Sequence, residues 1–343
     1  MADAGQQKKR IPSSWFVIAV VVIMGGVYFW KHYEIRLDNE RGLIVNGRNE
    51  NKAPGDDSQS KPSVEAAAGG ALQVIVPPNE VPPLTTMTIA TWDLSPLSFE
   101  KLSDETRARR IAEVIADFDL IAIQGIDRTT QPLDEIIRRI NATGKSYAYA
   151  IPKNIGNVPE YVAFIFDTKT VKYDPAKTRD VVEPTLSYRP LVAAFSTVQP
   201  PPEKAFTFYL INVKIPADRR DIESRVLGRI FRQVRDEDPA EDDVIMLGNF
   251  GQPVQHINSL RNIPYLAIVH DDLPTTIDGL GSTENIIFDN QRTVECIGNA
   301  KQVDLIKRFD LKLSEAAAIA EHLPICAEFS VFEALSLRPN HVP

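Results

Sequence analysis

The sequence predicts an α+β domain in which helices cover β-sheets, preceded by a single transmembrane helix. Residues 11–30 carry no charge, residues 31–84 are largely polar, and from Met87 onward apolar strand-like runs alternate with stretches of helical periodicity. Strands, then helices, then further strands are typical of sheets with helices packed on their faces. A chain of 343 residues with 43% hydrophobic residues can form one large domain with a smaller appendage.

The appendage begins with an apolar segment. Residues 1–10 end in a basic cluster, and residues 11–30 would span about 30 Å as a helix, the thickness of the hydrocarbon core. Aromatic residues near both ends suit the membrane interface. The basic cluster predicts a single-pass membrane protein with a cytoplasmic N-terminus and an extracytoplasmic C-terminal domain. A cleaved signal peptide is the alternative, although no small-residue cleavage site follows the apolar run.

Residues 31–84 are predicted to be a flexible tether. The stretch 47–70 is rich in Asn, Asp, Ser, Gly and Ala, so it buries too little apolar surface to offset chain entropy. The prolines of residues 77–83 predict a stiffened final spacer. The folded domain is predicted over residues 85–333, with residues 334–343 as a C-terminal tail.

Within the domain, β-branched and apolar runs predict strands, and apolar residues three and four apart predict helices. The predicted strands are residues 88–94, 120–126, 147–151, 162–167, 191–198, 206–213 and 244–247. The predicted helices are residues 104–118, 133–140 and 221–235. Asp104 is the expected N-cap of the first helix.

Charge and cysteine content restrict the function classes. The net charge of −8 lacks the basic excess of a protein that holds a nucleic-acid backbone, so general nucleic-acid binding is not expected. Cys296 and Cys326 are too few for a disulfide framework. Each lies in an apparent strand, and two interpretations stay open: a pair of small buried hydrophobes, or one bridge between neighbouring strands.

Four segments carry the pattern of apolar residues on which a family resemblance rests: residues 87–127, 161–167, 206–251 and 283–329. In this pattern and in their order, the segments resemble the endonuclease/exonuclease/phosphatase superfamily, which includes deoxyribonuclease I. The resemblance covers roughly residues 85–333. The resemblance implies a four-layer α/β/β/α sandwich, two packed β-sheets flanked by helices, with the active site at one end. It also implies an Mg²⁺-dependent phosphoric ester hydrolase.

The same resemblance shows where this chain departs from the family's motifs. Gly125 stands in place of a metal-binding Glu, Lys214 in place of a phosphate-contacting His, and Asn249 in place of the Asp that activates water. Asp93 and Gly251 each replace an Asn. Glycine offers Mg²⁺ no side-chain oxygen, and an amide cannot accept a proton from water. Because residues that act together contribute non-additively, these changes predict a catalytically degenerate site.

Other positions preserve part of the family's chemistry. His322 matches the His that meets the phosphate, and Glu321 before it replaces an Asp. Glu284 lies in a motif that matches the family's Tyr-Asp-Asn/Arg. Asp127 is a candidate replacement for the missing Glu, although residues two apart on a strand are separated by about 6 to 7 Å. With Asp93, these carboxylates are the candidate metal ligands.

The remaining candidates concern phosphate. His322, Asn249 and Lys214 are the candidate catalytic residues that the resemblance leaves. Tyr161 and Arg189 match family positions near the cleft and are candidate phosphate-binding residues. A Tyr packed at a strand edge and a solvated loop Arg are the ordinary alternatives.

Two hypotheses follow for the charged residues. In the first, Asp93 and Lys214 form an internal ion pair that replaces the metal and phosphate site; in the second, a shifted carboxylate cluster still binds Mg²⁺. The leading prediction is a membrane-anchored, catalytically degenerate domain that binds a phosphate-containing ligand or a protein partner and needs no cofactor. The alternative is an active divalent-metal-dependent phosphodiesterase or nuclease with a rearranged site. A scaffold whose former cleft is filled by side chains is a third option.

Overall fold

The computed structural model describes residues 33–38, 42–47, 85–153, 155, 159–270 and 273–334. The chain divides into two compact units, Met1–Val76 and Pro77–Pro343. In the first unit, β1 (Tyr33–Asp38) and β2 (Gly42–Gly47) form an antiparallel hairpin, which the sequence pattern does not predict. The expected membrane segment lies outside the described residues. Within them, no helix is long and apolar enough to cross a membrane.

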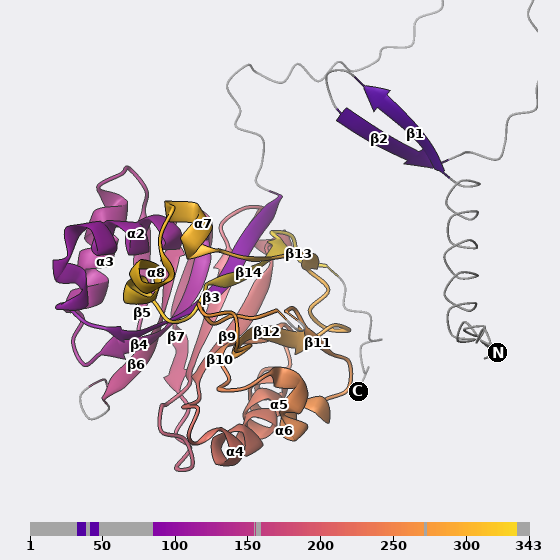
Figure 1. Cartoon of the computed structure of the whole chain (residues 1–343). Coiled ribbons are helices and arrows are strands. Elements are labelled where there is room, and N and C mark those ends of the chain that lie inside the picture. The colour runs from indigo at the N-terminus through magenta and orange to yellow at the C-terminus, as the bar shows by residue number, and fades with distance from the viewer. Residues whose placement is uncertain are drawn as a thin grey trace, which may run out of the picture. The chain divides into compact units, whose positions relative to one another are not determined.

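The second unit contains two six-stranded mixed sheets (Figure 1). The first sheet runs in the order β13 (Cys296–Gln302), β14 (Ile325–Ser330), β3 (Thr86–Leu97), β4 (Leu120–Asp127), β6 (Glu160–Asp167) and β5 (Tyr147–Ala150). The second runs in the order β11 (Leu266–Ile268), β12 (Glu284–Asp289), β10 (Val244–Asn249), β9 (Thr207–Lys214), β8 (Leu191–Thr197) and β7 (Val171–Asp180). Only β3 with β4 and β9 with β10 pair in parallel among these strands.

Helices cover the outer face of each sheet (Figure 1). The first sheet carries α2 (Glu105–Ile115), α3 (Gln131–Asn141), α7 (Leu305–Phe309) and α8 (Leu313–Ile319). The second sheet carries α5 (Leu227–Glu237) and α6 (Asn258–Arg261), with the short α4 (Arg220–Glu223) before them. Short 3₁₀ turns occupy Lys101–Ser103, Pro202–Lys204, Ser224–Val226 and Val254–His256.

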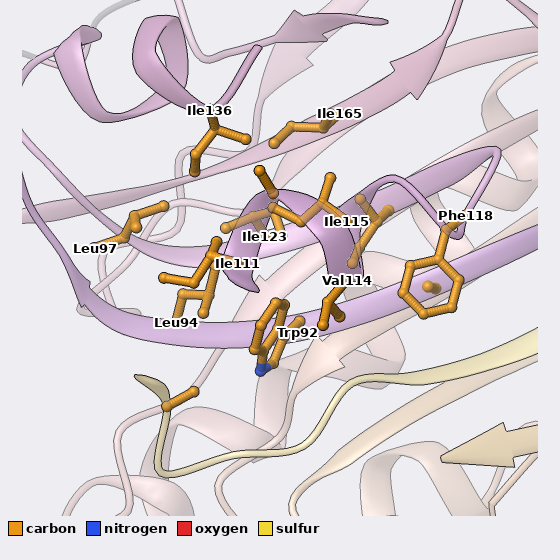
Figure 2. Packing of buried hydrophobic residues seen from close by; sticks show 14 of the residues in the cluster. Trp92, Leu94, Leu97, Ile111, Val114, Ile115, Phe118, Ile123, Ile136 and Ile165 are labelled. Carbon is orange, nitrogen blue, oxygen red and sulfur yellow. The ribbon is translucent and has the colours of Figure 1, made fainter. Parts of the chain in front are cut away.

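Three apolar clusters hold these layers together. One lies between the first sheet and its helices, where Trp92, Ile111, Ile136 and Ile165 pack together (Figure 2). The second joins the two sheets and contains many aromatic residues, including Phe206. The third packs α5 and α6 against the second sheet. The domain is therefore an α/β/β/α sandwich, as the family resemblance implies.

Local details follow the sequence closely. The Asp104 carboxylate accepts a hydrogen bond from the Arg107 backbone N–H at 2.8 Å, which confirms the predicted N-cap of α2. The helix expected over residues 221–235 is instead broken into α4, a 3₁₀ turn and α5. Cys296 and Cys326 are both free thiols, so they form no bridge with each other.

Candidate functional site

Strand register gathers the candidate residues at one end of the sandwich. Lys214 ends β9 and lies beside Asn249, which ends β10, and Asn249 in turn lies beside Glu284 at the start of β12. In the first sheet, Asp93 of β3 lies beside Gln124 of β4. The sheets pack face to face, so polar side chains from both meet where these strands end.

Asp93 is the centre of the site and is 2% exposed. Its Oδ2 accepts a hydrogen bond from the Asn249 side-chain amide at 2.8 Å, and its Oδ1 accepts bonds from the backbone N–H and the hydroxyl of Ser95. Burial favours the neutral acid, but Lys214, His322 and the bonds from Ser95 outweigh it and hold the pKa of Asp93 below its usual value. Asp93 is thus a buried carboxylate with both oxygens engaged.

Lys214 reaches this carboxylate indirectly. Its ammonium donates to the Ser95 hydroxyl and forms a salt bridge with Glu160, and it lies 4.7 Å from the ring centroid of Tyr188. Burial works against the charged form, yet Asp93 and Glu160 raise the pKa of Lys214 above its ordinary value. The predicted direct pair of Asp93 with Lys214 is therefore wrong in detail. Glu160 is the partner of Lys214, and Ser95 stands between the two predicted residues.

His322 forms the second ion pair of the site. Its Nδ1 lies 2.7 Å from Oε1 of Glu284, a fully buried carboxylate whose Oε2 accepts a bond from Thr283. Burial lowers the affinity of the ring for a proton, but Glu284, Asp93 and Glu321 together raise the pKa of His322 to about 9. The imidazole is accordingly a cation at neutral pH.

The space of the family's metal-binding Glu is closed. Gly125 has φ +78°, and a Cβ placed on it would lie 2.6 Å from the Cα of Ser95. Its neighbour Gln124 is buried and donates to the Asn212 side chain at 2.7 Å and to the Thr91 hydroxyl at 2.9 Å. Position 125 therefore has no space for a side chain. Gln124 connects the two sheets through its hydrogen bond to Asn212.

Asp93, Glu284 and His322 have the composition of a metal site, because each offers a ligand atom and these atoms lie within 4.8 Å of one another. In this arrangement Nδ1 of His322 faces Glu284, and both oxygens of Asp93 accept hydrogen bonds. A protonated imidazole has no lone pair on that nitrogen, so these three side chains would hold Mg²⁺ only after His322 had lost its proton. Here the three side chains form an ion network with Lys214 and Glu160.

Other predicted residues lie apart from this group. Asp127 and Glu321 are exposed, and neither belongs to the cluster of ligand atoms around Asp93. Tyr161 is buried, and its hydroxyl donates to the Thr129 carbonyl at 2.9 Å. Arg189 is exposed. Burial raises the pKa of Asp180 above its usual value, and the charge of Arg189 opposes this rise only in part. Phosphate binding by Tyr161 and Arg189 stays a prediction.

Several residues of the site carry no sequence signal. Ser95, Glu160 and Tyr188 belong to no family motif, yet they surround Lys214. Lys101 donates to the Leu94 carbonyl at 2.9 Å, and burial lowers its pKa to about 8 although Asp93 opposes this. The clue that the sequence offers is the absence of the expected Glu at position 125, which indicates that other side chains fill its place.

Comparison with known proteins bears on the fold. No protein-family model and no curated protein matches the chain. Among solved structures, a humanized D. rerio TDP2 carrying 14 mutations is similar, with 15% identity, a TM-score of 0.54, and coverage of 73% of this chain and 99% of that chain. An endonuclease/exonuclease/phosphatase from Bacteroides vulgatus has 10% identity, a TM-score of 0.52, and coverage of 74% and 100%. A truncated Caenorhabditis elegans TDP2 has 12% identity, a TM-score of 0.50, and coverage of 71% and 98%. The described domain therefore has the fold of the endonuclease/exonuclease/phosphatase family.

Proposed function

We propose that this chain is a membrane-anchored, catalytically degenerate member of the endonuclease/exonuclease/phosphatase fold that binds a ligand or a protein partner. One observation carries the proposal. The side chains that would hold a metal and activate water are instead bonded to one another, with Asp93 tied to Ser95 and Asn249, and Glu284 paired with His322. In this network the cations Lys214 and His322 already oppose the carboxylates of Glu160, Asp93 and Glu284, so Mg²⁺ would have to replace these pairings.

The anchor and topology rest on the sequence. The uncharged residues 11–30 and the basic cluster before them support a single membrane span with the folded domain outside the cytoplasm. The occupant of the site is a phosphate-containing ligand or a protein. A protein is favoured, since Lys214 is already paired with Glu160 and offers a phosphate no free ammonium.

A second candidate is the active phosphoesterase with a rearranged site. It is favoured by the close approach of ligand atoms from Asp93, Glu284 and His322. In that enzyme, His322 would lose its proton and rotate to release Glu284, after which these carboxylates could hold Mg²⁺. Glu321 and Asp127 would then need to approach from exposed positions.

The test combines metal titration with turnover on the purified full chain. Mg²⁺ and Mn²⁺ are titrated by calorimetry, and hydrolysis of bis(p-nitrophenyl) phosphate and p-nitrophenyl phosphate is followed with wild type and His322→Ala. We expect no turnover that depends on His322. Metal-dependent turnover that disappears in His322→Ala would contradict degeneracy and establish the second candidate. Titration with inorganic phosphate then separates the occupants, because saturable binding would favour a phosphate-containing ligand over a protein.

A further inference from the structure

A second group of acidic side chains lies at the other end of β10. Asp243 directly precedes β10, Glu295 directly precedes β13, and Glu333 follows β14. Their ligand atoms lie within 4.8 Å of one another, and Glu241 and Asp242 form a similar group with Asp243. Three segments that are distant in sequence thus bring carboxyl groups to one point.

The inner members of this group are buried and incompletely bonded. Asp243 and Glu295 are each 1% exposed. Oδ1 of Asp243 and Oε2 of Glu295 are buried atoms that receive no hydrogen bond from a donor in the described part of the chain, and the Thr293 hydroxyl lies against Asp243. Buried polar atoms are rarely left unpaired, so two such carboxylate oxygens in one cluster indicate a missing ligand.

The outer oxygens are held by backbone amides. Oε1 of Glu295 accepts a bond from the Ala334 N–H at 2.8 Å, and Oε2 of Glu333 accepts one from the Thr207 N–H at 3.0 Å. These bonds fix both carboxyl groups in place. They leave one oxygen of each group for a shared ligand.

The carboxyl groups have no ion-pair partner in the described part of the chain. None of its salt bridges involves Asp243, Glu295 or Glu333. Buried carboxylates in contact repel one another unless protons or a metal ion lie between them. The hydroxyl of Thr293 adds a neutral oxygen atom that a metal ion can bind.

We propose that Asp243, Glu295 and Glu333 form a binding site for a divalent cation, and that the ion is Ca²⁺. Ca²⁺ accepts six to eight oxygen ligands at about 2.3 to 2.6 Å, and opposite ligands are therefore about 4.6 to 5.2 Å apart. Mg²⁺ keeps several waters and rarely uses a cage made of protein oxygens alone. Thr293, together with Glu241 or Asp242, supplies further oxygens.

This site is separate from the network around Asp93. Residues 243 and 249 lie at the two ends of β10, which are separated by about 20 Å at the usual rise of a strand. Its function is structural, because the bound ion connects the segments before β10 and β13 with the chain that follows β14. Ca²⁺ binding consequently stabilises the folded domain by mass action.

The experiment uses the purified full chain after treatment with a chelator. Ca²⁺ is titrated by calorimetry, and thermal unfolding is followed with Ca²⁺, with Mg²⁺ and with chelator. We expect one saturable site for Ca²⁺, a rise in Tm of about 5 °C at saturation, and a smaller rise with Mg²⁺. Asp243→Asn and Glu295→Gln are expected to weaken Ca²⁺ binding at least tenfold, whereas the exposed control Glu203→Gln leaves it unchanged.

The variants also address the main alternative, in which the carboxyl groups simply share protons. That alternative predicts no binding heat and no effect of Ca²⁺ on Tm in wild type, and this result would overturn the proposal. Should the variants fail to fold, Tb³⁺ luminescence of wild type decides, because displacement of Tb³⁺ by Ca²⁺ supports the site and absence of Tb³⁺ binding refutes it. Loss of Ca²⁺ binding in His322→Ala but not in Asp243→Asn would place the ion in the network around Asp93. That result would also refute the proposed site at Asp243.

Discussion

The side chain of Ser95 fills the space beside Gly125 that any larger residue at position 125 would require. A Cβ on Gly125 would lie 2.6 Å from the Cα and 2.7 Å from the Cβ of Ser95. The same serine accepts a hydrogen bond from Lys214 and donates one to Asp93. The glycine at position 125 and the serine bridge between Lys214 and Asp93 are thus two aspects of one local arrangement.

Restoring a side chain at position 125 should therefore damage the fold. We expect Gly125→Ala to lower the free energy of unfolding by about 3 kcal/mol or more, because a positive φ and a backbone clash act together. Urea denaturation measures this change. Gly144→Ala is the matched control, since Gly144 has φ +88° and a Cβ added there would meet no atom within 4 Å. It should cost only about 1 to 2 kcal/mol. Equal costs at the two positions would show that Ser95 does not obstruct position 125.

Removing the buried ammonium should destabilise the domain. Lys214→Ala leaves Glu160 and Asp93 without their cation. Breaking a buried pair costs about 3 to 5 kcal/mol, and because the Glu160 side chain is partly exposed we expect a loss of about 2 to 3 kcal/mol. A double-mutant cycle with Glu160→Gln should recover part of this loss, since the second change removes the uncompensated charge. Lys204→Ala, at an exposed position, is the control and should change stability by less than about 0.5 kcal/mol. Additive effects of the two changes would contradict the pairing.

The ion pair of His322 predicts a pH dependence of stability. Its pKa is raised from 6.5 to about 9 by Glu284, Asp93 and Glu321 against the effect of burial. A raised folded-state pKa contributes stability that is fully present below pH 6.5 and is lost as the pH rises through about 9. One pKa unit corresponds to about 1.4 kcal/mol, so the contribution is on the order of 3 kcal/mol.

The difference between wild type and His322→Gln isolates this contribution from other groups, such as Lys101, that titrate in the same range. Urea denaturation at intervals from pH 6 to pH 10 should show wild type losing its advantage as the pH rises. A difference that does not change with pH would mean that the pKa of His322 is the same in the folded and unfolded protein, which would contradict the ion pair with Glu284. Glu284→Gln should remove most of the pH dependence, because the principal partner is then uncharged.

The buried amide pair between the sheets should be non-additive. Gln124→Leu leaves the Asn212 side-chain oxygen without its 2.7 Å donor, and we expect a loss of about 2 to 3 kcal/mol. The double variant Gln124→Leu with Asn212→Leu should lose less than the sum of the single variants, since no unpaired partner is left. Chemical denaturation of the four proteins measures the coupling. A coupling near zero would mean that each amide is satisfied independently.

Much of the fold could be predicted because the strands are buried on both faces. Runs such as residues 120–126 and 244–247 are apolar throughout, and both lie in sheet interiors. The broken helix before residue 227 could not be predicted. Its apolar periodicity continues, but the Glu223 carboxylate is fully buried and accepts a 2.5 Å bond from Ser187, which fixes the chain where α4 ends.

The site was predictable in position but not in connectivity. Matching motifs located Asp93, Asn249 and His322 at one end of the sandwich. The partner of Lys214 could not be found in this way, since Glu160 lies on a different sheet and belongs to no motif. Ion pairs between distant strands depend on register and side-chain length, which a motif does not record.

The pairing of Thr86 with Ser330 has a consequence for how the domain is presented. The start of β3, where the chain enters the sandwich, therefore lies beside the end of β14, the last strand. Along β3, Asp93 lies about 23 Å from that entrance at the usual strand rise. The network around Asp93 and the entry of the chain into the sandwich therefore lie toward opposite ends of β3, so changes in the sequence at Thr86 and Ser330 are separated from the site by most of the length of the strand.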